Sequence, residues 1–164
     1  ESDVLLVDQR ARSPGILRGV HWAAMQRKVD GARVLVYGGH PSYDRRKPTF
    51  LPRDWPAMDL VKKTVPLMRT LATKWNAPAV FMCDCNTGDS QPSMQWLKSG
   101  GGGLKFATAA TGDIDHIYLE TSPKLLGQAS NPRVVSPQRV GVRRPEWGMA
   151  DHPPVFVDIA LSGA

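Results

Sequence analysis

Residues 79–89 read AVFMCDCNTGD and carry the strongest signal of the chain's architecture. The first five of these residues are apolar and strand-favouring, and polar turn residues follow at once. Polar side chains directly after a buried strand need a reason to be there, because burying an unpaired polar group is costly. The stretch therefore predicts a core strand whose carboxyl end carries side chains used for chemistry.

Three more polar clusters lie beside apolar runs. They are Gly-Gly-His at residues 38–40, Gly-Asp-Ile-Asp-His-Ile at 112–117 and Ala-Asp-His-Pro-Pro-Val at 150–155. Each has a plain structural interpretation when it is taken alone, as a turn or a cap. The Asp-x-Asn-x-Gly-Asp pattern at 84–89 also resembles the start of a calcium loop, but the acidic residue that closes such a loop is absent.

The remaining pattern predicts strands and helices in alternation. We expect a helix from Trp55 to Trp75, capped by Asp54 and kinked or divided at Pro66, and a shorter one over residues 93–99. The four glycines at 100–103 predict a flexible loop. Mixed elements of this kind indicate an α/β or α+β sandwich. Strands are predicted over residues 4–7, 33–37, 79–83, 104–109, 114–119 and 155–161, with a further candidate over 16–25.

Length and composition narrow the class of protein. A chain of 164 residues predicts one domain, and 41% hydrophobic with 22% charged residues excludes a disordered tail. No apolar run reaches the roughly 20 residues of a membrane span and no secretory signal is present, so we expect a cytoplasmic protein. The formal net charge of +6 suits a polyanionic partner such as nucleic acid or a phosphate ester.

Cys83 and Cys85 are the two cysteines of the chain. In an extended strand both point to the same face, and neighbours this close do not readily form a disulfide. No second Cys pair completes a soft-metal site. We therefore expect two small buried thiols in a core strand.

The four clusters, taken in order, resemble the endonuclease/exonuclease/phosphatase superfamily of metal-dependent phosphoesterases. The pattern of that family is a strand ending in His, then Gly-Asp-Phe-Asn, Ile-Asp-x-Ile and Ser-Asp-His-x-Pro-Val. The chain offers His40, Cys-Asp-Cys-Asn at 83–86, Ile-Asp-His-Ile at 114–117 and Ala-Asp-His-Pro-Pro-Val at 150–155. The resemblance implies an α/β fold, a DNase I-like β-sandwich flanked by helices in four layers.

The resemblance also assigns roles to individual residues. It implies that His40 and His152 donate to the scissile phosphate, that Asp84 orients the attacking water and that Asn86 contacts a phosphate oxygen. Asp115 would pair with a histidine ring, and Asp151, together with Asp84, would lie at a Mg²⁺ or Mn²⁺ cofactor. We interpret Asp113 as a loop cap, His116 as packing or surface and Asp89 as a turn residue. A basic loop after His40 could contact a nucleic-acid backbone through Tyr43, Arg45, Arg46 and Lys47.

The chain departs from the family pattern at its beginning. The Asn and the Glu that the family carries on its first strands have no counterpart before Val4. We therefore expect residues 1–164 to be the C-terminal part of such a domain, with the N-terminal part on a preceding segment or a separate chain. The favoured function is a nuclease. The alternatives are a non-catalytic module that binds nucleic acid or acts structurally, and a phosphatase of a small or lipid phosphate ester.

Overall fold

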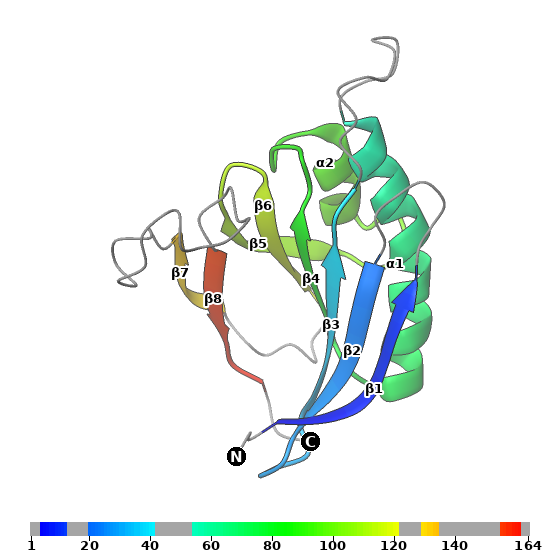
Figure 1. Cartoon of the computed structure of the whole chain (residues 1–164), viewed down its shortest axis with the longest axis vertical. Coiled ribbons are helices and arrows are strands. Elements are labelled where there is room, and N and C mark those ends of the chain that lie inside the picture. The colour runs from blue at the N-terminus through cyan, green and yellow to red at the C-terminus, as the bar shows by residue number, and fades with distance from the viewer. Residues whose placement is uncertain (1–3, 13–19, 42–53, 122–128, 135–154, 162–164) are drawn as a thin grey trace.

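The structure is a computed structural model that describes residues 4–12, 20–41, 54–121, 129–134 and 155–161 (Figure 1). Six strands form one sheet in the order β1-β2-β3-β4-β6-β5, and β7 pairs with β8 in a second. The strands are β1 (Val4–Arg12), β2 (Val20–Arg27), β3 (Arg33–Gly39), β4 (Ala79–Asp84), β5 (Phe106–Thr111), β6 (Asp115–Glu120), β7 (Ala129–Val134) and β8 (Val155–Ile159), and the helices are α1 (Trp55–Trp75) and α2 (Pro92–Ser99).

The strands β3 and β4 run parallel at the centre of the large sheet, whereas its other neighbours are antiparallel. A parallel pair needs a crossover connection, and α1 lies in that connection. Because β3 and β4 run in the same direction, their carboxyl ends meet at one edge of the sheet. That edge carries the candidate site.

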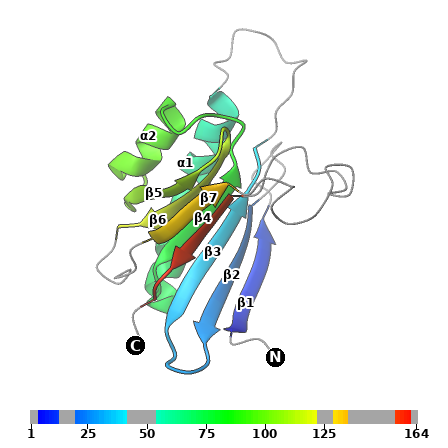
Figure 2. The same ribbon diagram turned by 90° about the vertical axis from the view of Figure 1, so that its left-hand side faces the viewer.

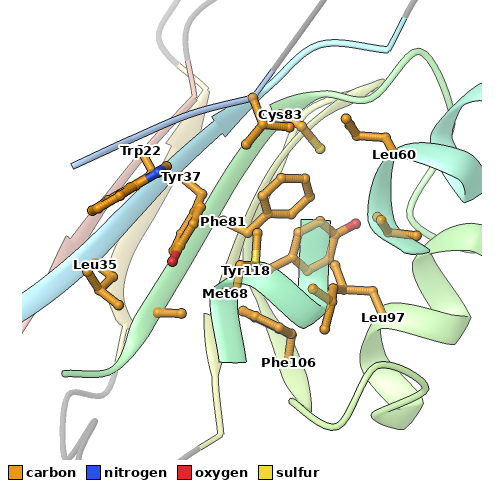
Figure 3. Packing of buried hydrophobic residues seen from close by; sticks show 14 of the residues in the cluster. Trp22, Leu35, Tyr37, Leu60, Met68, Phe81, Cys83, Leu97, Phe106 and Tyr118 are labelled. Atoms are coloured by element: carbon orange, nitrogen blue, oxygen red, sulfur yellow. The ribbon is translucent and has the colours of Figure 1, made fainter. Parts of the chain in front are cut away.

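Both helices cover one face of the large sheet (Figure 1). The core beneath them is aromatic and aliphatic, and Figure 3 shows Tyr37 and Phe81 from the central strands facing Met68 and Leu97 from the helices. All four of these side chains are 0% exposed. Burying such side chains is the main contribution to the stability of the fold.

The opposite face of the sheet packs against the β7–β8 pair (Figure 2). Val80, Ile117 and Leu119 form a second buried cluster there, and side chains of β8 pack on it at Val155 and Ile159. The described residues thus form a helix layer, a six-stranded sheet and a two-stranded sheet. The predicted α/β class is confirmed, and three of the four predicted layers lie within the described part of the chain.

The helix α1 continues through Pro66 as one element of 21 residues. Of the two predicted outcomes, a kink or a division, the division is excluded. Pro66 cannot donate to the carbonyl of Lys62, but both residues are exposed and water can satisfy that carbonyl. The opposite side of α1 is held by buried packing at Val61, Val65 and Met68, three of the side chains that the helical period predicts. Packing therefore outweighs the cost of the proline.

The glycine run at residues 100–103 forms a turn whose backbone lies close to Trp96 and Val65, a contact that the prediction of a flexible loop did not include. Gly100 ends α2 with a φ of +87°, and its N–H bonds back to the carbonyl of Leu97. A Cβ on Gly101 would overlap the Trp96 indole, and one on Gly102 would overlap the Val65 side chain. The glycines are therefore needed for close approach between this turn and α1.

We expect Gly102→Ala to lower the free energy of unfolding by about 1–3 kcal/mol, because the added methyl group must displace Val65 in the core. Chemical denaturation followed by far-UV circular dichroism measures the change. Gly38→Ala is the matched control, since no heavy atom lies within 4 Å of a Cβ built there. Equal losses in both variants would contradict the packed turn.

The strand β7 was not predicted, because its sequence ASNPRV contains turn residues and a proline. Within the described part of the chain it pairs with β8 alone, so a missing N–H on its other side is tolerated. Among the described residues, no helix is long and apolar enough to cross a membrane.

Candidate functional site

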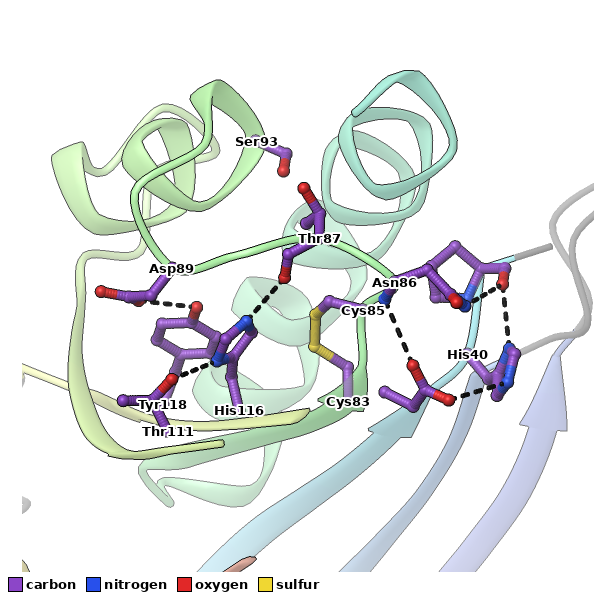
Figure 4. Close-up of a disulfide and its surroundings, with 12 residues drawn as sticks. His40, Cys83, Cys85, Asn86, Thr87, Asp89, Ser93, Thr111, His116 and Tyr118 are labelled. Atoms are coloured by element: carbon purple, nitrogen blue, oxygen red, sulfur yellow. Dashed lines mark hydrogen bonds and ion pairs between the residues drawn. A yellow bond between two sulfur atoms is a disulfide. The ribbon is translucent and has the colours of Figure 1, made fainter. Parts of the chain in front are cut away.

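The candidate site lies where β3 and β4 end side by side. Gly39 is in register with Cys83, so the residues that follow them, His40 and Asp84, emerge at the same edge. The His40 Nε2 atom lies 3.2 Å from the Asp84 Oδ2 atom (Figure 4). Parallel pairing of two strands thus joins two residues that are 44 positions apart in the sequence and that the motifs single out.

The main chain of Pro41 fixes the other side of the His40 ring. The His40 Nδ1 atom lies 2.9 Å from the Pro41 carbonyl oxygen, which can only accept a hydrogen bond. The Nδ1 atom is therefore the donor, and the Nε2 atom faces the carboxylate. A carboxylate at one ring nitrogen and a main-chain carbonyl at the other fix the orientation of the ring.

Asn86 joins the same group of side chains through both its backbone and its amide. Its backbone N–H donates to Asp84 Oδ1 at 3.2 Å, and its side-chain Nδ2 donates to the Pro41 carbonyl at 3.3 Å. Asn86 has a φ of +53°, a left-handed conformation that asparagine tolerates better than most residues. The residues His40, Asp84 and Asn86, which we call the β3–β4 corner, are thus held together by described contacts.

Asp115 lies beside the corner on the next strand. It is the first residue of β6 and the cross-strand partner of Asp84. Its carbonyl accepts from the Gly112 N–H at 2.7 Å. Paired residues of antiparallel strands point to the same face, so the carboxylates of Asp84 and Asp115 lie on one side of the sheet. The structure brings together these two carboxylates, but its contacts pair the histidine ring of His40 with Asp84.

The described residues do not by themselves form a metal site. Within residues 20–41, 54–121 and 155–161 no three His, Cys, Asp or Glu side chains converge closely enough to hold an ion. Asp84 and Asp115 are oxygen donors of the type that Mg²⁺ prefers, but two carboxylates make an incomplete set. We therefore derive no chemical step through a metal.

The loop that carries Asn86 is fixed by a buried carboxylate from the start of α1. Asp54 is 8% exposed, and its Oδ1 accepts from Thr87 Oγ1 at 2.9 Å. Its Oδ2 accepts from the Ser93 backbone N–H at 2.7 Å, and the Ser93 hydroxyl donates to Oδ1. Asp54 makes no side-chain cap on α1, so that prediction is wrong. The carboxylate instead caps the first turn of α2 and binds the site loop to it.

His116 fixes the same loop from the sheet. The side chain is 1% exposed, and its Nε2 atom lies 2.7 Å from the Thr87 carbonyl oxygen (Figure 4). Its Nδ1 atom lies 2.7 Å from Thr111 Oγ1. Nε2 is the donor to the carbonyl. These contacts agree with the packing role interpreted from the sequence.

Asp89 ends the loop. Its carboxylate binds three partners, which a residue that only forms a turn does not need. Its Oδ1 accepts from Thr108 Oγ1 at 2.9 Å and from the Tyr118 hydroxyl at 2.8 Å. Lys98 Nζ lies 2.7 Å from Oδ2. Partial burial opposes ionisation, but the hydrogen bonds from these partners outweigh it and hold the pKa of Asp89 below its usual value. The local sequence pattern does not predict these contacts, because the partners lie elsewhere along the chain.

Cys83 and Cys85 form a disulfide that brackets Asp84, so the expectation of free thiols is wrong (Figure 4). Their Cα atoms are 5.0 Å apart, within the usual disulfide range. The expectation assumed an extended chain, but β4 ends at Asp84 and the Cys85 N–H turns to donate to the Ile114 carbonyl at 2.8 Å. The turn shortens the separation of the two residues enough for a bond.

Several predicted site residues lie outside the described residues. They are His152, Asp151, Tyr43, Arg45, Arg46 and Lys47. The strand β8 begins at Val155. A Cβ atom built on Gly112 would lie 3.1 Å from the Cγ2 atom of Val155. The described start of β8 therefore lies next to the turn that precedes Asp115.

Comparison with known proteins defines the class of fold. No protein-family model and no curated protein sequence matches the chain. A Bacteroides thetaiotaomicron mannosyl-6-phosphatase structure is similar with a TM-score of 0.70 at 15% identity, over 97% of this chain and 68% of that one. The human Nocturnin catalytic domain with bound sulfate is similar with a TM-score of 0.70 at 11% identity, over 98% of this chain and 61% of that one.

A third similar structure is that of a protein described as a member of this family. An endonuclease/exonuclease/phosphatase family protein of Bacteroides thetaiotaomicron is similar with a TM-score of 0.67 at 17% identity, over 96% of this chain and 66% of that one. The chain therefore has the endonuclease/exonuclease/phosphatase fold, and the resemblance stated from the sequence is confirmed at the level of the fold. It spans about two thirds of the length of these structures.

Proposed function

We propose that this chain carries the later part of a phosphoesterase active site, centred on the β3–β4 corner. The contact between His40 Nε2 and Asp84 Oδ2 at 3.2 Å is the observation that carries this proposal. The two residues belong to separate sequence motifs, and the pairing of β3 with β4 joins them at one sheet edge. The shared fold with a mannosyl-6-phosphatase supports the same class of chemistry.

The contacts of the corner suit hydrolysis of a phosphate ester. Asp84 orients the His40 ring, and a carboxylate in this position can hold the attacking water molecule, as general-base chemistry requires. When the His40 ring turns from Asp84 toward the substrate, its N–H can donate to a phosphate oxygen. The amide of Asn86 has a second N–H beside the one given to Pro41, and that N–H can bind a phosphate oxygen.

The C-terminal motif extends this proposal to His152 and Asp151. They precede Val155 in the sequence by three and four positions, and β8 begins at Val155 beside Gly112. Together with the paired carboxylates of Asp84 and Asp115, this placement supports a shared site. We propose that His152 is a second donor to the phosphate, that Asp115 orients a histidine ring and that Asp151 is a metal ligand.

A nuclease is the favoured form of this phosphoesterase. A net charge of +6 attracts a polyphosphate backbone, and the basic group Arg45, Arg46 and Lys47 follows His40 in the sequence together with Tyr43. A phosphatase is the second candidate, because a structure of the same fold is a mannosyl-6-phosphatase. A non-catalytic module is the third, since the chain spans only about two thirds of its structural neighbours.

A substrate panel separates these candidates. The full-length protein is incubated with single-stranded DNA, duplex DNA, RNA and a set of sugar phosphates, and products are resolved by electrophoresis or as free phosphate. Cleavage of a nucleic acid supports the nuclease, and release of inorganic phosphate from a sugar phosphate supports the phosphatase. Binding of nucleic acid without turnover of any ester supports the non-catalytic module and contradicts the phosphoesterase.

We predict that activity depends on a divalent metal. Excess EDTA should lower the rate of ester hydrolysis by at least about 100-fold, because a hard cation supplies several kcal/mol of charge stabilisation at a phosphoryl group. Addition of Mg²⁺ or Mn²⁺ in excess over the chelator should restore the rate, and Ca²⁺ should not. An unchanged rate in EDTA would remove the metal from the proposal and leave the phosphoesterase itself standing.

A further inference from the structure

The Cys83–Cys85 disulfide encloses the central residue of the proposed site. Asp84 is the only residue between the two cysteines, and its carboxylate contacts both His40 and the Asn86 backbone. Any change in the path of the chain from residue 83 to residue 85 must therefore move the Cα of Asp84. Figure 4 shows the disulfide beside these contacts.

The surroundings of the two sulfur atoms leave little room for them to separate. Cys83 is 6% exposed and Cys85 is 1% exposed, and both belong to the main core cluster. Two thiol sulfur atoms need a van der Waals separation that is much larger than a bond, and a close-packed interior has no free space to absorb it. Breaking the bond must therefore shift the backbone at the end of β4.

The effect of the disulfide is expected to be local. The sequence separation of its cysteines is 2, and stabilisation by a cross-link through the unfolded chain grows with the length of the closed loop. A loop this short gains the least from that effect. The cysteines are therefore positioned to hold the turn at Asp84 rather than to stabilise the whole domain.

We propose that the Cys83–Cys85 disulfide positions the Asp84 carboxylate for His40, so that the site responds to thiol reductants. A dithiol reductant transfers two electrons and two protons: its thiolate attacks one sulfur atom, the S–S bond breaks through a mixed disulfide, and two protein thiols and an oxidised dithiol result. In the oxidised protein the contacts of the β3–β4 corner are maintained. The reduced protein has a displaced Asp84. The regulatory part of this inference rests on the proposed function.

The test compares the oxidised and the reduced full-length protein. In protein treated with oxidised glutathione, Cys83 and Cys85 should be joined to each other and resist alkylation by iodoacetamide after denaturation, and in protein treated with dithiothreitol both should be alkylated, as mass spectrometry of the peptide that contains them shows. Reduction should lower kcat by about 10- to 100-fold, because small misplacements of a catalytic group have effects of this size. The midpoint of thermal unfolding should change little.

Cys85→Ala is the matched variant, because it cannot form the bond and keeps Asp84 and His40. Dithiothreitol should not change its kcat, because it has no disulfide to reduce. The His40 ring resonances, followed by NMR, should shift on reduction of the wild type and stay unchanged when the variant is treated. A variant that fails to fold does not end the test, because the wild type is compared with itself in two redox states.

The outcomes separate this inference from the proposed function. If neither redox state hydrolyses any ester, the proposed function fails, and the His40 resonances still show whether the disulfide positions the corner. If kcat and the His40 resonances are the same in both states, the inference is wrong and the phosphoesterase stands. Alkylation of both Cys83 and Cys85 after treatment with oxidised glutathione would also overturn it.

Discussion

Asp84→Asn should lower kcat for phosphate ester hydrolysis by about 100- to 10,000-fold, the range expected for loss of a positioned acid–base group. The amide keeps the size of the side chain but loses the negative charge that faces His40 Nε2 at 3.2 Å. The amide oxygen can still accept the Asn86 backbone N–H, so that the new amide NH2 group faces His40 Nε2 in place of a carboxylate oxygen. KM should change much less than kcat, because the lost interaction acts mainly in the transition state.

Asp113→Asn is the matched control for this variant. Asp113 is an exposed aspartate of the turn before β6, and the sequence gives it no role in chemistry. Its substitution should leave kcat within about twofold of the wild type, in keeping with the small effect of surface changes. If Asp84→Asn and Asp113→Asn had the same kcat, Asp84 would have no part in the reaction.

Asp54→Ala should lower the free energy of unfolding by about 3–5 kcal/mol, the largest stability effect that we expect. The buried carboxylate accepts from Thr87 Oγ1, the Ser93 N–H and the Ser93 hydroxyl, and removing it leaves these donors without their acceptor. Each buried donor left unsatisfied costs about 1–3 kcal/mol. The loop that carries Asn86 should loosen as a result, since Thr87 is the next residue.

Urea denaturation followed by tryptophan fluorescence measures this loss. Asp59→Ala is the control, because Asp59 lies in the first turns of α1 and its carboxylate pairs with Lys63 at 2.8 Å near the surface. A surface pair of this kind contributes less than about 1 kcal/mol. A loss for Asp54→Ala no greater than that for Asp59→Ala would show that the buried contacts do not hold the two helices to the site loop.

Much of the fold could be predicted because its signals are local. The helix from Trp55 to Trp75 was predicted with its observed bounds, since its apolar residues recur at the helical period. The sequence does not decide whether the helix continues through Pro66 or divides there, because that depends on packing against the sheet. The glycine turn was misread for the same reason: only the positions of Trp96 and Val65 show that a side chain would not fit there.

The residues of the candidate site could be predicted in part. Contacts between residues far apart in the sequence could not be predicted from the local sequence pattern. Motif order singled out His40, Asp84 and Asn86, and the parallel pairing of β3 with β4 brings them together. The carboxylate of Asp54 was assigned to its own helix, because nothing in the sequence connects it with residues 33 and 39 positions later. The disulfide was missed because the chain was assumed to stay extended at Cys85.

The most direct test of the phosphoesterase proposal is hydrolysis of p-nitrophenyl phosphate and bis-p-nitrophenyl phosphate by the full-length protein with Mg²⁺, measured for the wild type and for His40→Ala. His21→Ala serves as the control, since His21 is an exposed histidine of β2. We predict release of nitrophenol by the wild type and the control, and at least about a 100-fold lower rate for His40→Ala. Equal rates in all three proteins, or no release by the wild type, would contradict the proposal.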